Sequence, residues 1–263
     1  MRITLLLLMT VTLLFIGNCI SLKAAEWGDL SLRFVYDGLP PKAKAVTITR
    51  DQAVCAKHAL VDESLLVNAE NRGLANVAVY LYLKRGVEAP PVHASYVQTR
   101  NDDVVLDNIH CRFKPHFTLI RTSQTLVLTN SDSVSHNSKL DCLRNASINP
   151  VIPAKGKLEH RFFASERLPS QVSCSVHPWM VGWLLVTDTP YMAISDDDGN
   201  VNIENLPIGT HTFQVWHERI GYVKSVKIND RPATWNKGRV TIEIKSGENA
   251  LGEVRLATDL FEE

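Results

Sequence analysis

Short segments with strand-like hydrophobic patterns, separated by turn residues, follow one another along most of the chain. Residues 30–38 (LSLRFVYDG) alternate apolar and polar positions and end in an Asp-Gly turn, whereas residues 74–83 (LANVAVYLYL) are almost entirely apolar. Alternation predicts a half-buried β-strand, and a short apolar run rich in Val and Tyr predicts a buried one. No stretch has the periodicity of a helix longer than a turn or two, so the pattern predicts an all-β protein.

The same pattern suggests how the chain is divided. Strand-like segments separated by long irregular stretches predict one β-sandwich over residues 101–188. Residues 195–218 contain three strand-like runs separated by Asp-Gly and Pro-Ile-Gly turns, which is typical of consecutive hairpins. We therefore expect a second small β-sandwich over residues 189–263. Residues 26–100 either supply strands to the first sandwich or form a separate β region, and the pattern leaves both open.

The N-terminus has the pattern of an export signal. Arg2 precedes an apolar run over residues 3–16, and small residues follow at Ala24 and Ala25. Such a run is too short for a stable membrane span and predicts a signal peptide over residues 1–25, so we expect a periplasmic or secreted protein. An uncleaved N-terminal anchor is the alternative. The mature chain would be close to neutral, which argues against nucleic-acid binding, and no stable membrane span is expected in it.

One short loop concentrates residues that can bind a metal. The motif CSVHPWM places a thiol, an imidazole and a thioether at Cys174, His177 and Met180, between two strand-like segments. Upstream, His136 follows a strand that ends in an Asn-Ser-Asp turn. Strands at both ends of a loop can hold donors in place without a large ordering cost. Two imidazoles, a thiolate and a weak axial thioether are the ligand set of a blue-copper electron-transfer site.

A structural disulfide is the alternative role for Cys174. The mature chain keeps four cysteines, and an exported protein permits disulfides. Spacing alone leaves open a bridge from Cys174 to Cys142 or to another cysteine. Such a bridge would not require His177 and Met180 nearby, so we favour copper.

The other histidines and the enzyme motifs add little. We expect His110 and His116 to be structural or exposed, and His217 to pack beside an acid. The sequence has no haem-attachment motif, nucleophile elbow or Gly-rich phosphate loop. A centre with four protein ligands also leaves no open position for a substrate. We therefore expect a carrier and not an enzyme.

The order and spacing of the candidate ligands resemble those of the cupredoxins, the family of blue type-1 copper proteins. An early His-Asn pair, here His136–Asn137, precedes a late Cys-x2-His-x2-Met loop. The Pro after the His and the aromatic residue before the Met are most similar to amicyanin. The resemblance implies a Greek-key β-sandwich that binds one type-1 copper ion through His136, Cys174, His177 and Met180.

The cupredoxin resemblance also implies roles around the site. Asn137 would lie behind the thiolate as a hydrogen-bonding residue that orients the ligands. His177 would lie nearest the surface and act as the electron port, with Pro178 and Trp179 in an apolar docking patch around it. The implied function is single-electron transfer between redox proteins such as a c-type cytochrome or a dehydrogenase. A copper carrier or storage protein, or a metal-free interaction module that keeps the fold, are the alternative functions.

Nearly all of the mature chain is similar to planctomycete cupredoxin-like proteins labelled methylamine-utilisation-like. The shared features include VDESLLV, CRFKPH, NSDSVSHN and DGNVNIENLPIG. This resemblance implies a disulfide between Cys55 and Cys111 and leaves Cys142 unpaired. The C-terminal segment resembles transthyretin-like or carboxypeptidase-regulatory-like modules. No residue specifies an amine substrate, a redox partner or an oligomeric state.

Overall fold

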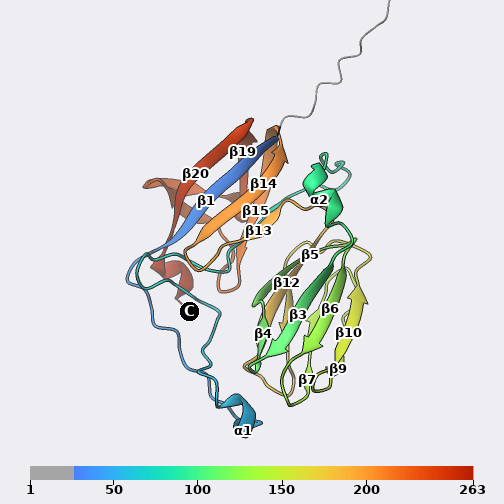
Figure 1. The fold of residues 1–263 in the computed structure, drawn as a ribbon. Coiled ribbons are helices and arrows are strands. Elements are labelled where there is room, and N and C mark those ends of the chain that lie inside the picture. Colours follow the sequence, from blue (N-terminus) through green and yellow to red (C-terminus); the bar gives the residue numbers. More distant parts are fainter. Residues whose placement is uncertain (1–26, 263) are drawn as a thin grey trace, which may run out of the picture.

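Two groups of β-sheets form most of the computed structural model, which describes residues 27–262 (Figure 1). Its two α-helices are short, α1 (Gln52–Cys55) and α2 (Ala94–Gln98). The prediction of an all-β protein is confirmed. In this part of the chain neither helix has the length or apolar character needed to cross a membrane. The predicted signal peptide lies outside the described residues.

The lower group in Figure 1 is a β-sandwich, called the middle sandwich below. One sheet has the order β10-β6-β3-β4, the other has the order β5-β12-β11-β8, and the short pair β7-β9 lies at one end. Buried side chains of both sheets, among them Leu106, Leu126 and Leu184, form its apolar core. The strands are β3 (Asp103–Ile109), β4 (Arg112–Lys114), β5 (Phe117–Arg121), β6 (Thr125–Asn130), β7 (His136–Asn137), β8 (Lys139–Asp141), β9 (Val151–Ile152), β10 (Lys157–Arg161), β11 (Ser170–Ser173) and β12 (Val181–Thr187).

The upper group consists of two sheets, called the outer sheets below, that share a second apolar core including Phe34, Tyr191 and Phe213. Their orders are β14-β1-β20-β17-β18 and β13-β2-β15-β16, with β19 paired to β15. The strands are β1 (Trp27–Asp37), β2 (Ala78–Leu81), β13 (Met192–Ile194), β14 (Asn200–Pro207), β15 (Gly209–His217), β16 (Gly221–Tyr222), β17 (Ser225–Ile228), β18 (Arg231–Thr234), β19 (Arg239–Ile244) and β20 (Gly247–Ala257), with 3-10 turns η1 (Asn236–Gly238) and η2 (Thr258–Phe261).

The N-terminal strands belong to the outer sheets. Strand β1 lies between β14 and β20, antiparallel to the first and parallel to the second, and β2 pairs with β13 and β15. The sequence left open whether residues 26–100 supply strands to the middle sandwich. These two strands complete the outer sheets instead, because the strands that they pair with all lie after residue 189.

The segment between β1 and β2 nevertheless reaches the middle sandwich. Residues 38–61, called the strap below, leave the outer sheets and carry α1 to the end of the middle sandwich where β7 and β9 lie (Figure 1). There Cys55 forms a disulfide with Cys111, with a Cα–Cα distance of 5.5 Å, as the family resemblance implied. The buried side chains of Cys55 and Leu60 pack into the core of the middle sandwich. The strap therefore links the two groups of sheets.

Candidate metal centre

The loop with the CSVHPWM motif joins two paired strands. Strands β11 and β12 are antiparallel, with Ser173 opposite Val181, so residues 174–180 form the connection. The Cys174 N–H donates to the Met180 carbonyl (3.2 Å), and the Met180 N–H donates to the His177 carbonyl (2.8 Å). These bonds close the base of the loop. The residues of the motif are thus held in a compact turn.

The upstream histidine is positioned by a second set of hydrogen bonds. His136 lies in β7 and pairs with Ile152 of β9. The Asn130 side chain fixes the turn before β7, because its Nδ2 donates to the carbonyls of Val134 and Ile152 and its Oδ1 accepts from the Asp132 N–H. The Asn-Ser-Asp turn noted in the sequence therefore supports the His136 loop.

Three predicted ligands converge in the folded chain. Donor atoms of His136, Cys174 and His177 all lie within 4.8 Å of one another, and all three side chains are buried. The two Nδ1 atoms of the histidines are 2.8 Å apart, and Cys174 Sγ is 3.7 Å from His177 Nδ1. The structure brings together residues that are 41 positions apart in the sequence.

Carboxylates set the orientation of both imidazoles. His136 Nε2 lies 2.8 Å from Asp132 Oδ2, and His177 Nε2 lies 2.8 Å from Asp51 Oδ2. When each Nε2–H donates to its carboxylate, the two Nδ1 atoms face each other and must share either a proton or a metal ion.

These donors fit a metal ion. The donor atoms lie close enough together for one ion to contact all three, once the two Nδ1 atoms separate from their hydrogen-bonding distance of 2.8 Å. Imidazole and thiolate are donors that copper accepts. The residues therefore fit copper on the chemistry and spacing of the donors.

The protonation of the three groups follows from their surroundings. Burial opposes a positive charge on His136, but hydrogen bonds to Asp132 and Cys174 outweigh burial and raise its pKa to about 9. Burial lowers the pKa of His177 in spite of its hydrogen bond to Asp51. Burial opposes ionisation of Cys174, yet hydrogen bonds from His136 and from backbone N–H groups lower the pKa of the thiol. Without a metal, a proton on His136 takes the cation's place beside a readily ionised thiol.

Asn137 joins the two loops. Its Oδ1 accepts from Cys174 Sγ (3.3 Å), from the Ser175 N–H (2.8 Å) and from the Val176 N–H (3.3 Å). Asn137 thus lies beside the thiol, and its role in orienting the ligands stays a prediction.

The remaining predicted residues surround this group. Met180 is buried in the same apolar core as Cys174, and its role as axial ligand stays a prediction. Pro178 is exposed. Trp179 is half-buried, and its Nε1–H donates to the Cys111 carbonyl (3.2 Å). A docking patch around Pro178 and Trp179 also stays a prediction.

His177, which was expected to lie nearest the surface, is covered in the structure. Its side chain is 0% exposed, although the neighbouring Val176 is 42% exposed. The reason is the strap, which brings the Asp51 carboxylate over the outer edge of the ring. In this chain the imidazole edge is covered by a residue far away in the sequence.

Sequence reasoning missed both carboxylates. Asp132 had a detectable signal, because it stands in the Asn-Ser-Asp turn four residues before His136. The Asp132 carboxylate also accepts hydrogen bonds from the backbone N–H groups of His110 and Cys111. Asp51 had no such signal, because the strap has no clear period and lies 126 residues from His177.

The described cysteines form one disulfide and leave two free thiols. Within residues 27–262 Cys142 and Cys174 are free, so the alternative of a disulfide at Cys174 is not realised. Cys142 is half-buried, and its backbone N–H donates to Ser147 Oγ. It belongs to neither of the two groups of described residues that could hold a metal ion.

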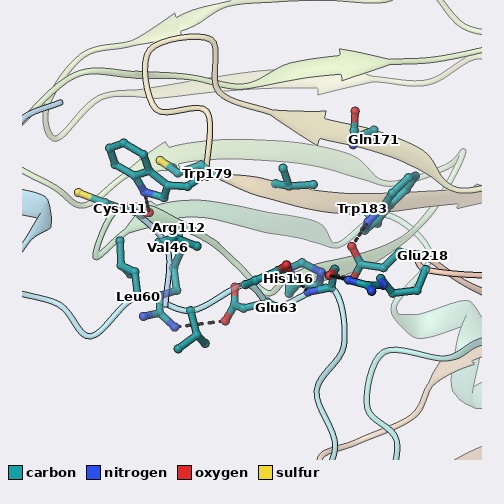
Figure 2. Close-up of a pocket in the computed structure, with 16 residues that line it drawn as sticks. Val46, Leu60, Glu63, Cys111, Arg112, His116, Gln171, Trp179, Trp183 and Glu218 are labelled. Atoms are coloured by element: carbon teal, nitrogen blue, oxygen red, sulfur yellow. Dashed lines mark hydrogen bonds and ion pairs between the residues drawn. The ribbon is translucent and has the colours of Figure 1, made fainter. Parts of the chain in front are cut away.

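A cavity of about 470 Å³ lies beside the loop of residues 174–180, between the middle sandwich, the strap and the outer sheets (Figure 2). Trp179 and Met180 line one part of it. In another part the buried His116 lies between two carboxylates, with Nε2 2.6 Å from Glu218 Oε1 and Nδ1 3.5 Å from Glu63 Oε2. Burial opposes a charge on His116, but the two carboxylates raise its pKa to about 9. The cluster is a buried ion pair that joins the middle sandwich to the outer sheets.

His217 differs from its expected role. It is buried, its Nδ1 accepts the Arg219 N–H (3.3 Å), and its ring packs edge-on against Phe261. Within residues 27–262 no acidic side chain pairs with it, so the expected acid partner is wrong.

Comparisons with known proteins find similarity among solved structures alone. No family model matches the chain, and no curated protein does. A purple cupredoxin from Nitrosopumilus maritimus is 26% identical over 33% of this chain and 100% of its own (TM-score 0.27). A mutant of amicyanin in the Cu(I) state is 17% identical over 32% of this chain and 81% of its own (TM-score 0.29). A copper-containing nitrite reductase from Thermus scotoductus is 17% identical over 40% of this chain and 24% of its own (TM-score 0.30).

Proposed function

We propose that the protein is an exported type-1 copper protein that carries single electrons between redox partners. The observation that carries this proposal is the convergence of His136, Cys174 and His177 in one buried group. Met180, on the same loop and in the same core, is the proposed weak axial ligand. We expect no enzymatic activity, because four protein ligands leave no position for a substrate.

The surroundings of the site suit electron transfer. When bound, copper supplies the one-electron Cu(I)/Cu(II) couple. Cys174 would provide the thiolate, and the contacts that lower the pKa of its thiol favour that form. Asp132 and Asp51 hold the Nδ1 atoms of His136 and His177 toward the thiolate. Because these residues lie on loops closed by strands and hydrogen bonds, they need little rearrangement when the charge changes.

The direct test is a visible absorption spectrum of residues 26–263 titrated with Cu(II). The proposal predicts an intense thiolate-to-copper band that saturates at one copper per chain and is absent in Cys174→Ser. Cys142→Ser is the matched control, since Cys142 is the other free cysteine of the described chain and should leave the band unchanged. If wild type shows no such band, the copper site is refuted.

A second measurement separates electron transfer from copper storage. The copper-loaded protein is mixed with a reduced c-type cytochrome, and reduction is followed at the thiolate band. Loss of the band on the millisecond-to-second scale, with copper retained by the protein, supports an electron carrier. Slow reduction together with release of copper to an acceptor protein would favour a copper carrier or storage protein instead.

A further inference from the structure

The strap covers the metal centre at one defined point. His177 is fully buried, yet Val176 and Pro178 on either side of it are exposed. Its Nε2 is 2.8 Å from Asp51 Oδ2, and the Asp51 side chain is 41% exposed. Asp51 therefore forms the outer wall of the centre, with one side facing the ligand and the other facing water.

The backbone at Asp51 directs its carboxylate away from its own helix. Aspartate before a helix usually accepts a hydrogen bond from the first turn. Asp51 precedes α1 in the left-handed conformation (φ 45°, ψ 41°) and makes no side-chain capping bond. Its carboxylate is free to contact His177 instead. In this conformation the Asp51 carboxylate does not cap α1 and instead contacts His177.

The disulfide anchors the strap beside the metal-binding loop. Cys55 lies four residues after Asp51 and is bonded to Cys111, whose carbonyl accepts the Trp179 Nε1–H. Cys111 is also within 4.8 Å of Asp132 and His136 donor atoms. Next to it, the rings of His58 and His110 stack with centroids 4.4 Å apart. The strap is thus attached to the turn between β3 and β4, whose backbone N–H groups donate to Asp132, the carboxylate beside the first histidine.

We propose that Asp51 completes the metal centre as a positioning residue that the disulfide-anchored strap delivers to His177. It holds the ring with Nδ1 directed inward, and it closes the centre to water and to small reagents. The identity of the metal rests on the proposed function. The closure itself is a property of the metal-free protein and can be tested without copper.

The test measures how fast Cys174 reacts with dithiodipyridine in the metal-free mature chain. A Cys142→Ser background leaves Cys174 as the free thiol of the described residues. In the reaction the Cys174 thiolate displaces one thiopyridone, whose absorbance reports the rate. Asp51→Ala should increase the rate about tenfold, the factor that one net hydrogen bond of about 1.4 kcal/mol contributes to closure.

Two variants control for other effects of the substitution. Asp51→Asn keeps an oxygen acceptor and a residue type that tolerates left-handed backbone, so its rate should stay within about twofold of wild type. Asp230→Ala removes a carboxylate from another left-handed position (φ 65°) in the outer sheets, and should leave the rate unchanged. Circular dichroism checks that each variant is folded. A second route, Cys55→Ser with Cys111→Ser, releases the anchor and should also raise the rate.

The outcomes distinguish this inference from the proposed function. An unchanged rate in folded Asp51→Ala would overturn the role of Asp51, even if the wild type forms the copper band. A faster rate in Asp51→Ala, with the slow rate kept in Asp51→Asn, supports closure even if no copper band forms. Equal acceleration in Asp51→Asn and Asp51→Ala would overturn the hydrogen bond to His177 as the closing contact.

Discussion

The Nδ1 atoms of His136 and His177 face each other at 2.8 Å, while the Nε2 atom of each ring lies against a carboxylate. Two neutral imidazoles oriented in this way repel each other unless a cation lies between them or beside them. The carboxylates therefore hold both rings in the orientation that the candidate metal centre needs, even in the metal-free chain. The hydrogen bonds from the two imidazoles to Asp132 and Asp51 can therefore be tested by substitution, as the ligands can.

Asp132→Asn should weaken metal binding. The carboxylate accepts from His136 Nε2 and from two backbone N–H groups, and an amide at this position would present a donor to at least one of them. Loss of such an outer partner costs about 10–100-fold in metal affinity. Competition with a chelator of known affinity measures the change. Asp103→Asn, at an exposed position in β3, is the control, and equal affinities for Asp132→Asn and wild type would contradict the prediction.

His116 should make stability depend on pH. Because its folded pKa is raised to about 9 from 6.5, its contribution is fully present below about pH 6.5 and is lost as the pH rises through about 9. Urea unfolding of the metal-free protein should show a loss on the order of 2–3 kcal/mol across this range that His116→Gln does not share. His136 is present in both proteins, so its titration cancels in the comparison. Parallel pH profiles for the two proteins would refute the assignment.

Asn137→Ala should destabilise the protein even without metal. The substitution removes the acceptor of the Ser175 and Val176 N–H groups and the contact with the Cys174 thiol. Losing these part-buried hydrogen bonds costs about 1–3 kcal/mol in total, measurable as the free energy of unfolding in denaturant. Asn202→Ala, at an exposed position of β14, should change this value by less than about 0.5 kcal/mol. If both variants unfold like wild type, Asn137 does not join the loops as described.

The disulfide should contribute to stability through the length of the loop that it closes. Cys55 and Cys111 are 56 residues apart, for which the chain-entropy relation gives about 4 kcal/mol. The double variant Cys55→Ser with Cys111→Ser should lower the free energy of unfolding by about 2–4 kcal/mol. Cys142→Ser, which removes a free thiol, serves as the control. If the double variant loses no more free energy of unfolding than the control, removing the disulfide adds little conformational entropy to the unfolded chain.

Local patterns in the sequence were sufficient for the all-β fold. Alternating and apolar runs predicted β1 and β2 as strands, because burial on one or both faces imposes a pattern on the residues themselves. The pattern did not specify which sheet each strand joins, because an alternating strand fits any sheet with an apolar face. The pairing of β1 with β20 is a contact between distant parts of the chain that neither strand encodes alone.

In the candidate site, too, local sequence predicted some features, and contacts between distant residues determined others. Cys174, His177 and Met180 share one loop, and His136 has a turn of its own, so residue type and spacing were enough to propose them as ligands. The burial of His177 could not be predicted in this way, since it depends on Asp51, which contacts it from an irregular segment. Carboxylates are common at the surface, and nothing in the sequence around Asp51 indicates that it contacts His177.

The ion pair between His116 and Glu218 limits how the chain can be divided. A fragment cut at residues 101 and 188 would keep His136, Cys174, His177 and Met180. It would lose Glu63 and Glu218 around His116 and leave the edge of His177 bare. Without these carboxylates nothing would hold His116 charged, and the face that now packs on the strap and the outer sheets would be open to solvent, which favours unfolding or self-association. Gene fusions or truncations that contain the ligand-bearing segment alone are therefore expected to fail unless they also include the strap, Glu63 and the β15–β16 turn.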